Sequence, residues 1–481
     1  MRWVIVAMVM AAVAPVFGQE ETDEIQELDV EQARKFAQQG GGLSIDNPTT
    51  LSLEAAEILA THKGGMSLTG VATLTPEVAR ALAKHQGNLI LNGLTTLSSE
   101  VAEGLAAHES FLWLDGLTTL SPEAARAMSN KKDGVSLGGL ATLSPEVAKA
   151  LAEQKGTLTL GLPTLTPDVA EMLAAHESVL FLPRVTTITP DVAKVVAKHR
   201  GYLCLDRLEG LPPDVAEALT THAGALSLLG LTTLSDDAAR ALAAHKGVLA
   251  LGGLTTLSDE AAEALAKHKG GLLLRGPFTL SVANAEALAK SEGQLSFDGL
   301  TKLSPEVARA LAKHEGALEI RGLLTLSPEA AGALAKHSGW LALVGLLTLS
   351  PEEAERDGFR IDGLPTLSTE VGEALAKHKG GLNLLQDFTT LSDGAAKALA
   401  KIEGPLALDG LRSLTPDVAR ALAKHDGPLA LNSLSTITDE AAEALAKHES
   451  DLFLEGLTEI SPEAAATLRS NPKVVLPERF R

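Results

Sequence analysis

The sequence is poor in cysteine and in aromatic residues. A single cysteine among 481 residues excludes a disulfide framework and any metal site built from several thiolates. With 10 Phe, 3 Trp and 1 Tyr against 45% hydrophobic residues, the core must consist mainly of leucine, alanine and valine. This apolar content is too high for a disordered chain.

Basic residues are also in the minority. The 41 Lys and Arg residues face 61 Asp and Glu residues, which gives a formal net charge of -20. Nucleic acids and anionic membranes bind clustered basic side chains, so neither is expected as the main partner. The length suggests about three ordinary domains, but the composition argues against them.

Long apolar runs are lacking except at the N-terminus. Arg2 precedes an apolar run from Trp3 to Phe17, with Val16 and Gly18 at the -3 and -1 positions of a cleavage site. About 15 apolar residues are too few to cross a bilayer comfortably, and an acidic stretch follows. We predict a signal peptide at 1–18, a mature chain without a membrane span, and a secreted, periplasmic or cell-envelope location. An uncleaved anchor is the alternative.

One 23-residue pattern recurs through the rest of the chain, Gly-x-Leu-x-Leu-x-Gly-Leu-Thr-Thr-Leu-Ser-Pro-Glu-Val-Ala-x-Ala-Leu-Ala-Lys-His-x. The position after Lys, here called the corner slot, marks the register. It holds His62, His85, His108, Lys131, Gln154, His176, His199, His222, His245, His268, Ser291, His314, His337, His378, Ile402, His425, His448 and Asn471. About 20 copies at a fixed period predict a solenoid over 42–470.

Each copy reads as one strand and one helix. Leu-x-Leu, as in Leu226 and Leu228, alternates and predicts a short strand with inward leucines. Ser-Pro-Glu predicts a helix start, because serine caps free N–H groups and proline suits the first helical position. Val307 and Leu311 then fall on one inner face. Lys-His-x-Gly predicts the helix end, with Gly316 expected as a left-handed cap.

The repeated motif resembles leucine-rich repeats, nearest to the cysteine-containing subtype. Leu231 and Leu254 occupy its Cys/Asn position, and Leu234-Ser235-Asp236 and Leu257-Ser258-Asp259 resemble its helix start. The resemblance implies an α/β solenoid of about 20 coils, with a parallel sheet on the concave face and short helices on the convex face, in a bacterial exported protein. Leucine replaces the usual Asn or Cys ladder. A right-handed β-helix is the alternative, but a capped helix of about eleven residues argues against it.

The ends of the solenoid depart from the pattern. Residues 19–41 read as an acidic segment with a capping helix, and 471–481 as a cap strand with a basic tail. Near 350–358 one copy lacks the Ala-Leu-Ala-Lys-His part. A hinge or docking notch and a tolerated deletion on the outer face are both open there.

All 13 histidines fall in the corner slot. A metal-binding ladder is conceivable, but the lysine beside most of them opposes a cation, and duplication alone explains the repetition. Imidazolium at a helix end is favoured by the helix dipole. Protonating all the histidines near their ordinary pKa would then move the net charge to about -7 and change solubility.

Catalytic signatures are missing from the sequence. It has no HExxH, GxSxG, P-loop or dinucleotide fingerprint, and Cys204 near His199 makes a poor nucleophilic pair. We expect no enzyme, cofactor or metal site.

The variable wall positions are the informative ones. The residues that flank and separate the two strand leucines face the concave wall, and most are small. Two clusters are not, and they form the predicted ligand-binding patch: Phe111, Trp113 and Asp115, then Phe181, Tyr202 and Asp206. Two coils of small residues between Trp113 and Phe181 predict a groove about 14 Å wide at the spacing of parallel strands. Neutral drift on a solvated wall is the alternative.

Two functions therefore remain. The first is an exported, non-enzymatic binding or scaffold module that recognises a protein or a carbohydrate through its concave wall. The second is a structural spacer of the cell envelope without a specific ligand, which the uniformity of the copies favours.

Overall fold

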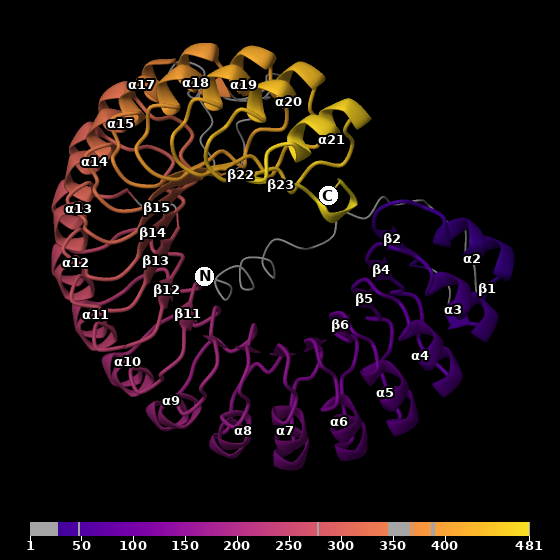
Figure 1. Ribbon diagram of the computed structural model, residues 1–481. Coiled ribbons are helices and arrows are strands. Elements are labelled where there is room, and N and C mark those ends of the chain that lie inside the picture. The colour runs from indigo at the N-terminus through magenta and orange to yellow at the C-terminus, as the bar shows by residue number, and fades with distance from the viewer. Residues whose placement is uncertain are drawn as a thin grey trace, which may run out of the picture. The chain divides into compact units, whose positions relative to one another are not determined.

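The structure is a computed structural model that describes residues 27–46, 49–276, 279–344, 366–367, 369–385 and 390–480. These divide into two compact units, with the boundary after Gly230. The predicted signal peptide and the shortened copy near 350–358 lie outside the described residues. In Figure 1 each unit is a row of coils with strands on its inner side and helices on its outer side.

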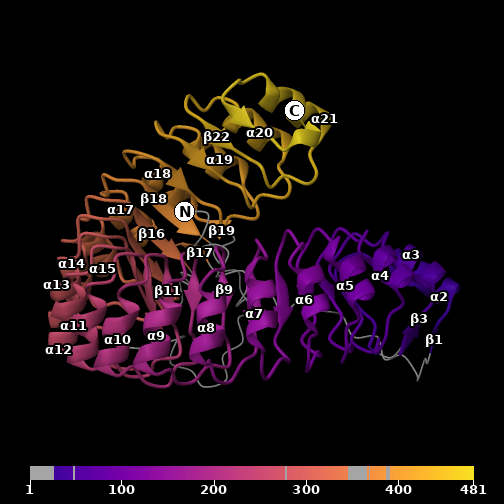
Figure 2. The same ribbon diagram turned by 90° about the horizontal axis from the view of Figure 1, so that it is seen from below.

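The first unit carries one parallel sheet along its concave wall. Its strands are β2 (Leu43–Ser44), β4 (Met66–Ser67), β5 (Leu89–Ile90), β6 (Leu112–Trp113), β7 (Val135–Leu137), β8 (Leu158–Leu160), β9 (Leu180–Phe181), β10 (Leu203–Cys204) and β11 (Leu226–Leu228). A separate parallel pair joins β1 (Glu27–Leu28) to β3 (Thr50–Leu51). The helices are α2 (Val30–Ala37), α3 (Leu53–Leu59), α4 (Pro76–Leu82), α5 (Ser99–Ala106), α6 (Pro122–Met128), α7 (Pro145–Ala152), α8 (Pro167–Leu173), α9 (Pro190–Val196) and α10 (Pro213–Leu219). Figure 2 shows these helices following one another in chain order.

The second unit repeats the arrangement. Its sheet contains β12 (Leu249–Leu251), β13 (Leu272–Arg275), β14 (Leu295–Asp298), β15 (Leu318–Arg321), β16 (Leu341–Val344), β18 (Leu382–Leu385), β20 (Leu406–Ala407), β21 (Leu429–Ala430), β22 (Leu452–Phe453) and β23 (Val474–Val475). A separate pair joins β17 (Thr366–Leu367) to β19 (Thr390–Leu391). The helices are α11 (Asp236–Leu242), α12 (Asp259–Leu265), α13 (Val282–Leu288), α14 (Pro305–Leu311), α15 (Pro328–Leu334), α17 (Thr369–Leu375), α18 (Asp393–Leu399), α19 (Pro416–Leu422), α20 (Asp439–Leu445), α21 (Pro462–Arg469) and the 3₁₀ turn η1 (Glu478–Phe480).

Parallel pairing keeps equivalent residues of successive coils side by side. Leu318 pairs with Leu341 in the usual repeat register. Leu341 then pairs directly with Leu382, so the ladder continues from β16 to β18 without a rung between them. The packing of coil on coil is therefore preserved on both sides of the irregular copy.

The predicted helix start is confirmed. Ser121 Oγ accepts a hydrogen bond from Ala124 N at 3.1 Å, Pro122 takes the first helical position, and Glu123 lies in the first turn. These groups satisfy a free N–H group and complement the positive end of the helix dipole. Among the helices with a described cap, only α10 lacks a side-chain cap bond, because Pro212 stands at its cap position.

The helix end differs from the prediction in two ways. Helices in the repeats span seven or eight residues rather than about eleven, because the chain tightens after the last leucine. In one coil Lys84 N bonds to Ala81 O at 3.2 Å and His85 N to Leu82 O at 3.0 Å, both across three residues. Gly316 is not among the glycines with positive φ. A methyl group there would lie 2.7 Å from His314 Nε2, so close packing explains this glycine.

The leucines form the predicted shared interior. Four leucines of one region are fully buried: Leu112 of β6, Leu114 directly after it, Leu117 at the Cys/Asn position and Leu105 of α5. Burying one leucine contributes about 1.5–3 kcal/mol, and stacking shares these residues between neighbouring coils. The prediction of an α/β solenoid with a parallel sheet and short helices is confirmed.

Candidate functional site

All six predicted patch residues lie in the first unit. The strand register places the central wall residues in one row across the sheet: Ile90, Trp113, Ser136, Thr159, Phe181 and Cys204. The row shows that Trp113 and Phe181 flank two small residues, as the repeat spacing predicts. We call this region the aromatic groove.

One side of the aromatic groove is a ring pair. Phe111 and Trp113 have ring centroids 4.3 Å apart at an interplanar angle of 52°. Phe111 is only 8% exposed, because its ring lies over the backbone of Gly134 in the next coil. Trp113 is half-buried. Phe111 therefore packs against both Trp113 and Gly134, and Trp113 is the more exposed ring of the pair.

The floor consists of small, buried side chains. Ser136 is 4% exposed, and Thr157 and Thr159 are each 8% exposed. Three strand steps at about 4.8 Å separate Trp113 from Phe181, which makes about 14 Å. A flat ring or a single side chain fits across such a floor.

The far side carries Phe181 and Tyr202, both half-buried. Cys204 follows Tyr202 by two residues, in β10, and it is 4% exposed. Burial, reinforced by the charge of Asp206, raises the pKa of the Cys204 thiol well above its ordinary value. A nucleophilic cysteine needs the opposite shift, so this side of the groove offers a binding surface rather than a reactive thiol.

Asp115 and Asp206 hold successive coils together. Asp115 Oδ1 accepts hydrogen bonds from Ser136 Oγ at 2.5 Å and from Gly138 N at 2.6 Å. Asp206 Oδ1 accepts from Ser227 Oγ and, at 3.1 Å, from Leu229 N. Both carboxylates are therefore engaged with the following coil. Charged acceptors form the stronger hydrogen bonds, so these two residues stiffen the edges of the aromatic groove.

Other residues at the same position make the same bond. Asn92 accepts from Asp115 N at 2.9 Å, Asp409 from Asn432 N at 2.9 Å, and Asn432 from Glu455 N at 3.1 Å. These side-chain bonds to the next coil were not predicted from the sequence. The pattern that indicates them is the recurrence of Asn or Asp two residues after the central wall position.

The concave wall of the second unit carries charged side chains on β13, β14 and β15, whereas the groove of the first unit is aromatic. Arg275 Nε donates to Asp298 Oδ2 at 2.7 Å, and Arg321 Nη2 to Glu319 Oε1 at 2.5 Å. These ion pairs could not be predicted from the sequence, because they depend on the pairing of β13, β14 and β15. These charges are largely matched within the wall.

The corner slot is buried, contrary to the expectation of solvated imidazolium groups. All 13 histidines are at most 3% exposed. Burial lowers the pKa of most of them, and that of His108 and His199 to about 4. The predicted change of net charge near pH 6.5 is therefore wrong for the folded chain, because a protonated ring inside the fold is deprived of the water that would solvate its charge.

Side chains of the corner slot bind the carbonyl groups of the preceding coil. Asn471 Nδ2 donates to Ala446 O at 2.9 Å and to His448 O at 2.8 Å. His448 Nε2 lies 3.1 Å from Gly427 O. Lys131 Nζ donates to His108 O at 2.6 Å and to Ser110 O at 2.5 Å. The slot thus provides a polar ladder at the helix corner, where helix carbonyls lack partners.

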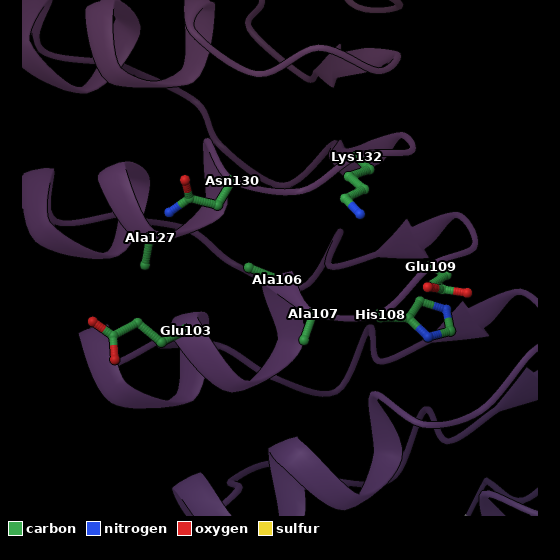
Figure 3. Close-up of a pocket in the computed structure, with 8 residues that line it drawn as sticks. All are labelled: Glu103, Ala106, Ala107, His108, Glu109, Ala127, Asn130 and Lys132. Carbon is green, nitrogen blue, oxygen red and sulfur yellow. The ribbon is translucent and has the colours of Figure 1, made fainter.

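Two open hollows lie on the helix side, at the coils where the histidines are interrupted. The first, about 390 Å³, lies between the ends of α5 and α6; its lining includes Glu103, Glu109, Asn130 and Lys132 (Figure 3). The second, about 630 Å³, lies between α7 and α8 beside Gln154. Their mixed charges indicate no particular ligand.

Neither a metal site nor a membrane span is found in the described part of the chain. No group of three or more His, Cys, Asp or Glu side chains there could hold a metal ion. No described helix has the length and apolar character that crossing a bilayer requires.

Comparisons with known proteins give likenesses of structure alone. No protein-family model matches the sequence, and no curated protein matches it. Among solved structures, a leucine-rich-repeat protein of Leptospira interrogans is 19% identical with a TM-score of 0.30, covering 95% of this chain and 100% of that one. An internalin of Listeria monocytogenes is 15% identical with a TM-score of 0.35, covering 75% and 89%. A chain of the Toll–Spatzle complex of Drosophila is 14% identical with a TM-score of 0.38, covering 73% of this chain and 51% of that one.

The chain's own coils carry the assignment. Most of the described coils contain a short strand paired in parallel with its neighbours, a buried Leu-x-Leu, a further buried leucine and a helix with a side-chain cap. These repeated strand–helix units give the chain the fold of a leucine-rich-repeat solenoid.

Proposed function

We propose that the chain is an exported, non-enzymatic binding module that recognises a protein or a glycan through the aromatic groove. The observation that carries this proposal is the placement of half-buried Trp113, Phe181 and Tyr202 around a floor of small residues. Aromatic side chains are the usual anchors of protein interfaces and the usual platforms for sugar rings.

The rigidity of the groove supports recognition. Asp115 and Asp206 tie their strands to the following coils, and Phe111 packs under Trp113. A ligand therefore meets a surface whose side chains are already ordered. Less conformational entropy is lost on binding to such a surface.

The spacer alternative is favoured by the uniformity of the other coils. Many wall positions in both units hold serine, alanine or glycine, which give length without a distinctive surface. The two functions differ in whether the aromatic groove affects which molecules the chain binds.

The test compares three forms of the full chain: unchanged, Trp113→Ala/Phe181→Ala, and Phe453→Ala. Phe453 is the matched control, because it is half-buried at the central wall position of β22 in the second unit. Each form is used to capture proteins from the producing cells and to probe a glycan array. We expect a ligand bound by the unchanged chain and by Phe453→Ala to be lost from the double variant. Identical binding by all three forms would favour the spacer.

A further inference from the structure

The buried histidines form stacked runs inside each unit. In the first unit the runs are His62–His85–His108 and His176–His199–His222. In the second they are His245–His268, His314–His337–His378 and His425–His448. Ring centroids are 5.9–6.3 Å apart, and planes within 13° of parallel. We call these side chains the corner column.

The corner column is enclosed by backbone. A methyl group on Gly87 would lie 2.9 Å from His85 Nε2, and one on Gly380 would lie 2.9 Å from His378 Nε2. Glycine at this position lets the carbonyl of one coil approach the ring of the next. A protonated ring that needs water has no room to obtain it without separation of the coils.

Two opposing effects act on each ring. Backbone carbonyls favour protonation, whereas burial and the neighbouring imidazoles oppose it. For His199 burial is the largest influence, followed by repulsion from His176 and His222, and together they lower its pKa to about 4. The pKa of His337 is lowered for the same reasons, with His314 and His378 as neighbours. The neutral ring is therefore the folded form.

Acid is expected to destabilise the folded chain. An unfolded histidine titrates near pH 6.5, so between that pH and about 4 the unfolded chain binds more protons than the folded chain. The buried histidines therefore contribute their full stability above about pH 6.5. This contribution is lost as the pH falls from about 6.5 to about 4. Carboxylates such as Glu123 and Glu306 lose their stabilising charge only below their ordinary range.

We propose that the corner column is an acid-sensitive switch, which loosens the coil corners when the surroundings acidify from pH 7 to about 5. A charge on one ring would lie about 6 Å from the next ring and repel a second proton. Several rings of one run can therefore be protonated together only when the coil corner opens to water. Lys131 and Gln154 stand between the runs of the first unit, and Ser291 and Ile402 stand between those of the second. Lys131 is the one titratable group among these four, and its charge further opposes protonation of His108.

No buried carboxylate is found on α8, α9 or α10, the described helices that end at the run His176–His199–His222. The charged groups on α8, α9 and α10 and their ends are exposed: Glu171, Glu177, Lys194, Lys198, Arg200 and Glu217. Asp168, Asp191 and Asp214 lie in the first turns, at the opposite ends of the helices. The neighbouring imidazoles thus remain the close titratable groups.

The experiment replaces one run and leaves the other as an internal control. The variant is His176→Gln/His199→Gln/His222→Gln, since Gln154 shows that glutamine fits the corner slot and donates to backbone carbonyls. Amide hydrogen exchange of the full chain is measured at pH 7 and pH 5 and corrected for intrinsic rates. In the unchanged chain we expect protection to fall about tenfold at both the 176–225 and 314–381 corners. In the variant only the 314–381 corner should respond.

Two outcomes would overturn the proposal: protection that is equal at pH 7 and pH 5 in the unchanged chain, or an equal loss at both corners of the variant. If the variant does not fold at pH 7.5, imidazole NMR of the unchanged chain decides. Rings that protonate one by one near pH 6.5 without loss of amide protection would be incompatible with a switch. Lys198→Gln, an exposed neighbour, should behave as the unchanged chain.

Discussion

The ring of Phe111 covers Gly134 so closely that a side chain on Gly134 would clash with Phe111 Cε2 and Cδ2. Trp340 lies over Gly381 in the same way in the second unit. An aromatic ring paired with glycine on the neighbouring strand fills the space that the missing side chain leaves. The aromatic residues before the strand thus have a structural role as well as any role in binding.

Gly134→Ala should therefore destabilise the chain by about 1–3 kcal/mol, because overpacking displaces the Phe111 ring. Tryptophan fluorescence should change as well, because Trp113 packs against Phe111. Urea unfolding monitored by circular dichroism measures the first effect. Gly210→Ala is the control, since a methyl group there has nothing within 4 Å. Equal stability of the two variants would contradict the packing described.

Asp115→Ala should cost about 1–3 kcal/mol, because Gly138 N and Ser136 Oγ lose their shared acceptor. Asp115→Asn should cost less, since Asn92 makes the equivalent backbone bond in the preceding coil. Thermal unfolding at several protein concentrations gives both values. Asp133→Asn, at an exposed carboxylate, serves as control. A larger loss for Asn than for Ala would refute the acceptor role.

Lys131→Gln should stabilise the chain at pH 7 by up to about 3 kcal/mol. Burial lowers the pKa of Lys131 to about 8 from an ordinary 10.5, so at neutral pH the folded chain holds a buried charge in the corner slot, which costs stability. The folded chain releases this proton more readily than the unfolded one, so the gain should shrink as the pH rises above about 8.

Urea unfolding at pH 7 and pH 9.5 measures this gain. Lys132→Gln changes the exposed neighbour and should have little effect at either pH. A Lys131→Gln variant that is less stable than the unchanged chain at pH 7 would show that the two carbonyl bonds outweigh burial.

Cys204 should react with a thiol reagent only when its coil opens, because its side chain is buried and its pKa is raised. At pH 8 labelling of the folded chain should be slower than that of the urea-unfolded chain by at least about a hundredfold. Absorbance of the released thiolate follows the reaction. Equal rates would place the thiol at the surface.

The repeat made the coil predictable from the sequence. Leu226 and Leu228 alternate, and Ser121 with Pro122 marks a helix start, so strand, helix and parallel ladder all follow from local signals. The length of the helix did not, because its last turn tightens through bonds across three residues at Lys84 and His85.

The burial of the corner slot was harder to foresee. Lys-His at a helix end suggests two solvated cations, yet lysine points out and histidine points in. Ile402 in the same slot was the available signal, since an isoleucine in register with histidines indicates an interior position. The exposure of Trp113 and Phe181 could be inferred from strand alternation, whereas the burial of Phe111 depends on the glycine beside it.

The direct pairing of Leu341 with Leu382 has an evolutionary consequence. Since each rung needs only the rung before it, a gene encoding such a stack can gain, lose or corrupt a copy while the neighbours on either side still join. Copy number is then a freely adjustable trait. Trp113 and Phe181 stand in different copies, so such events between them would change their spacing while leaving the stack intact.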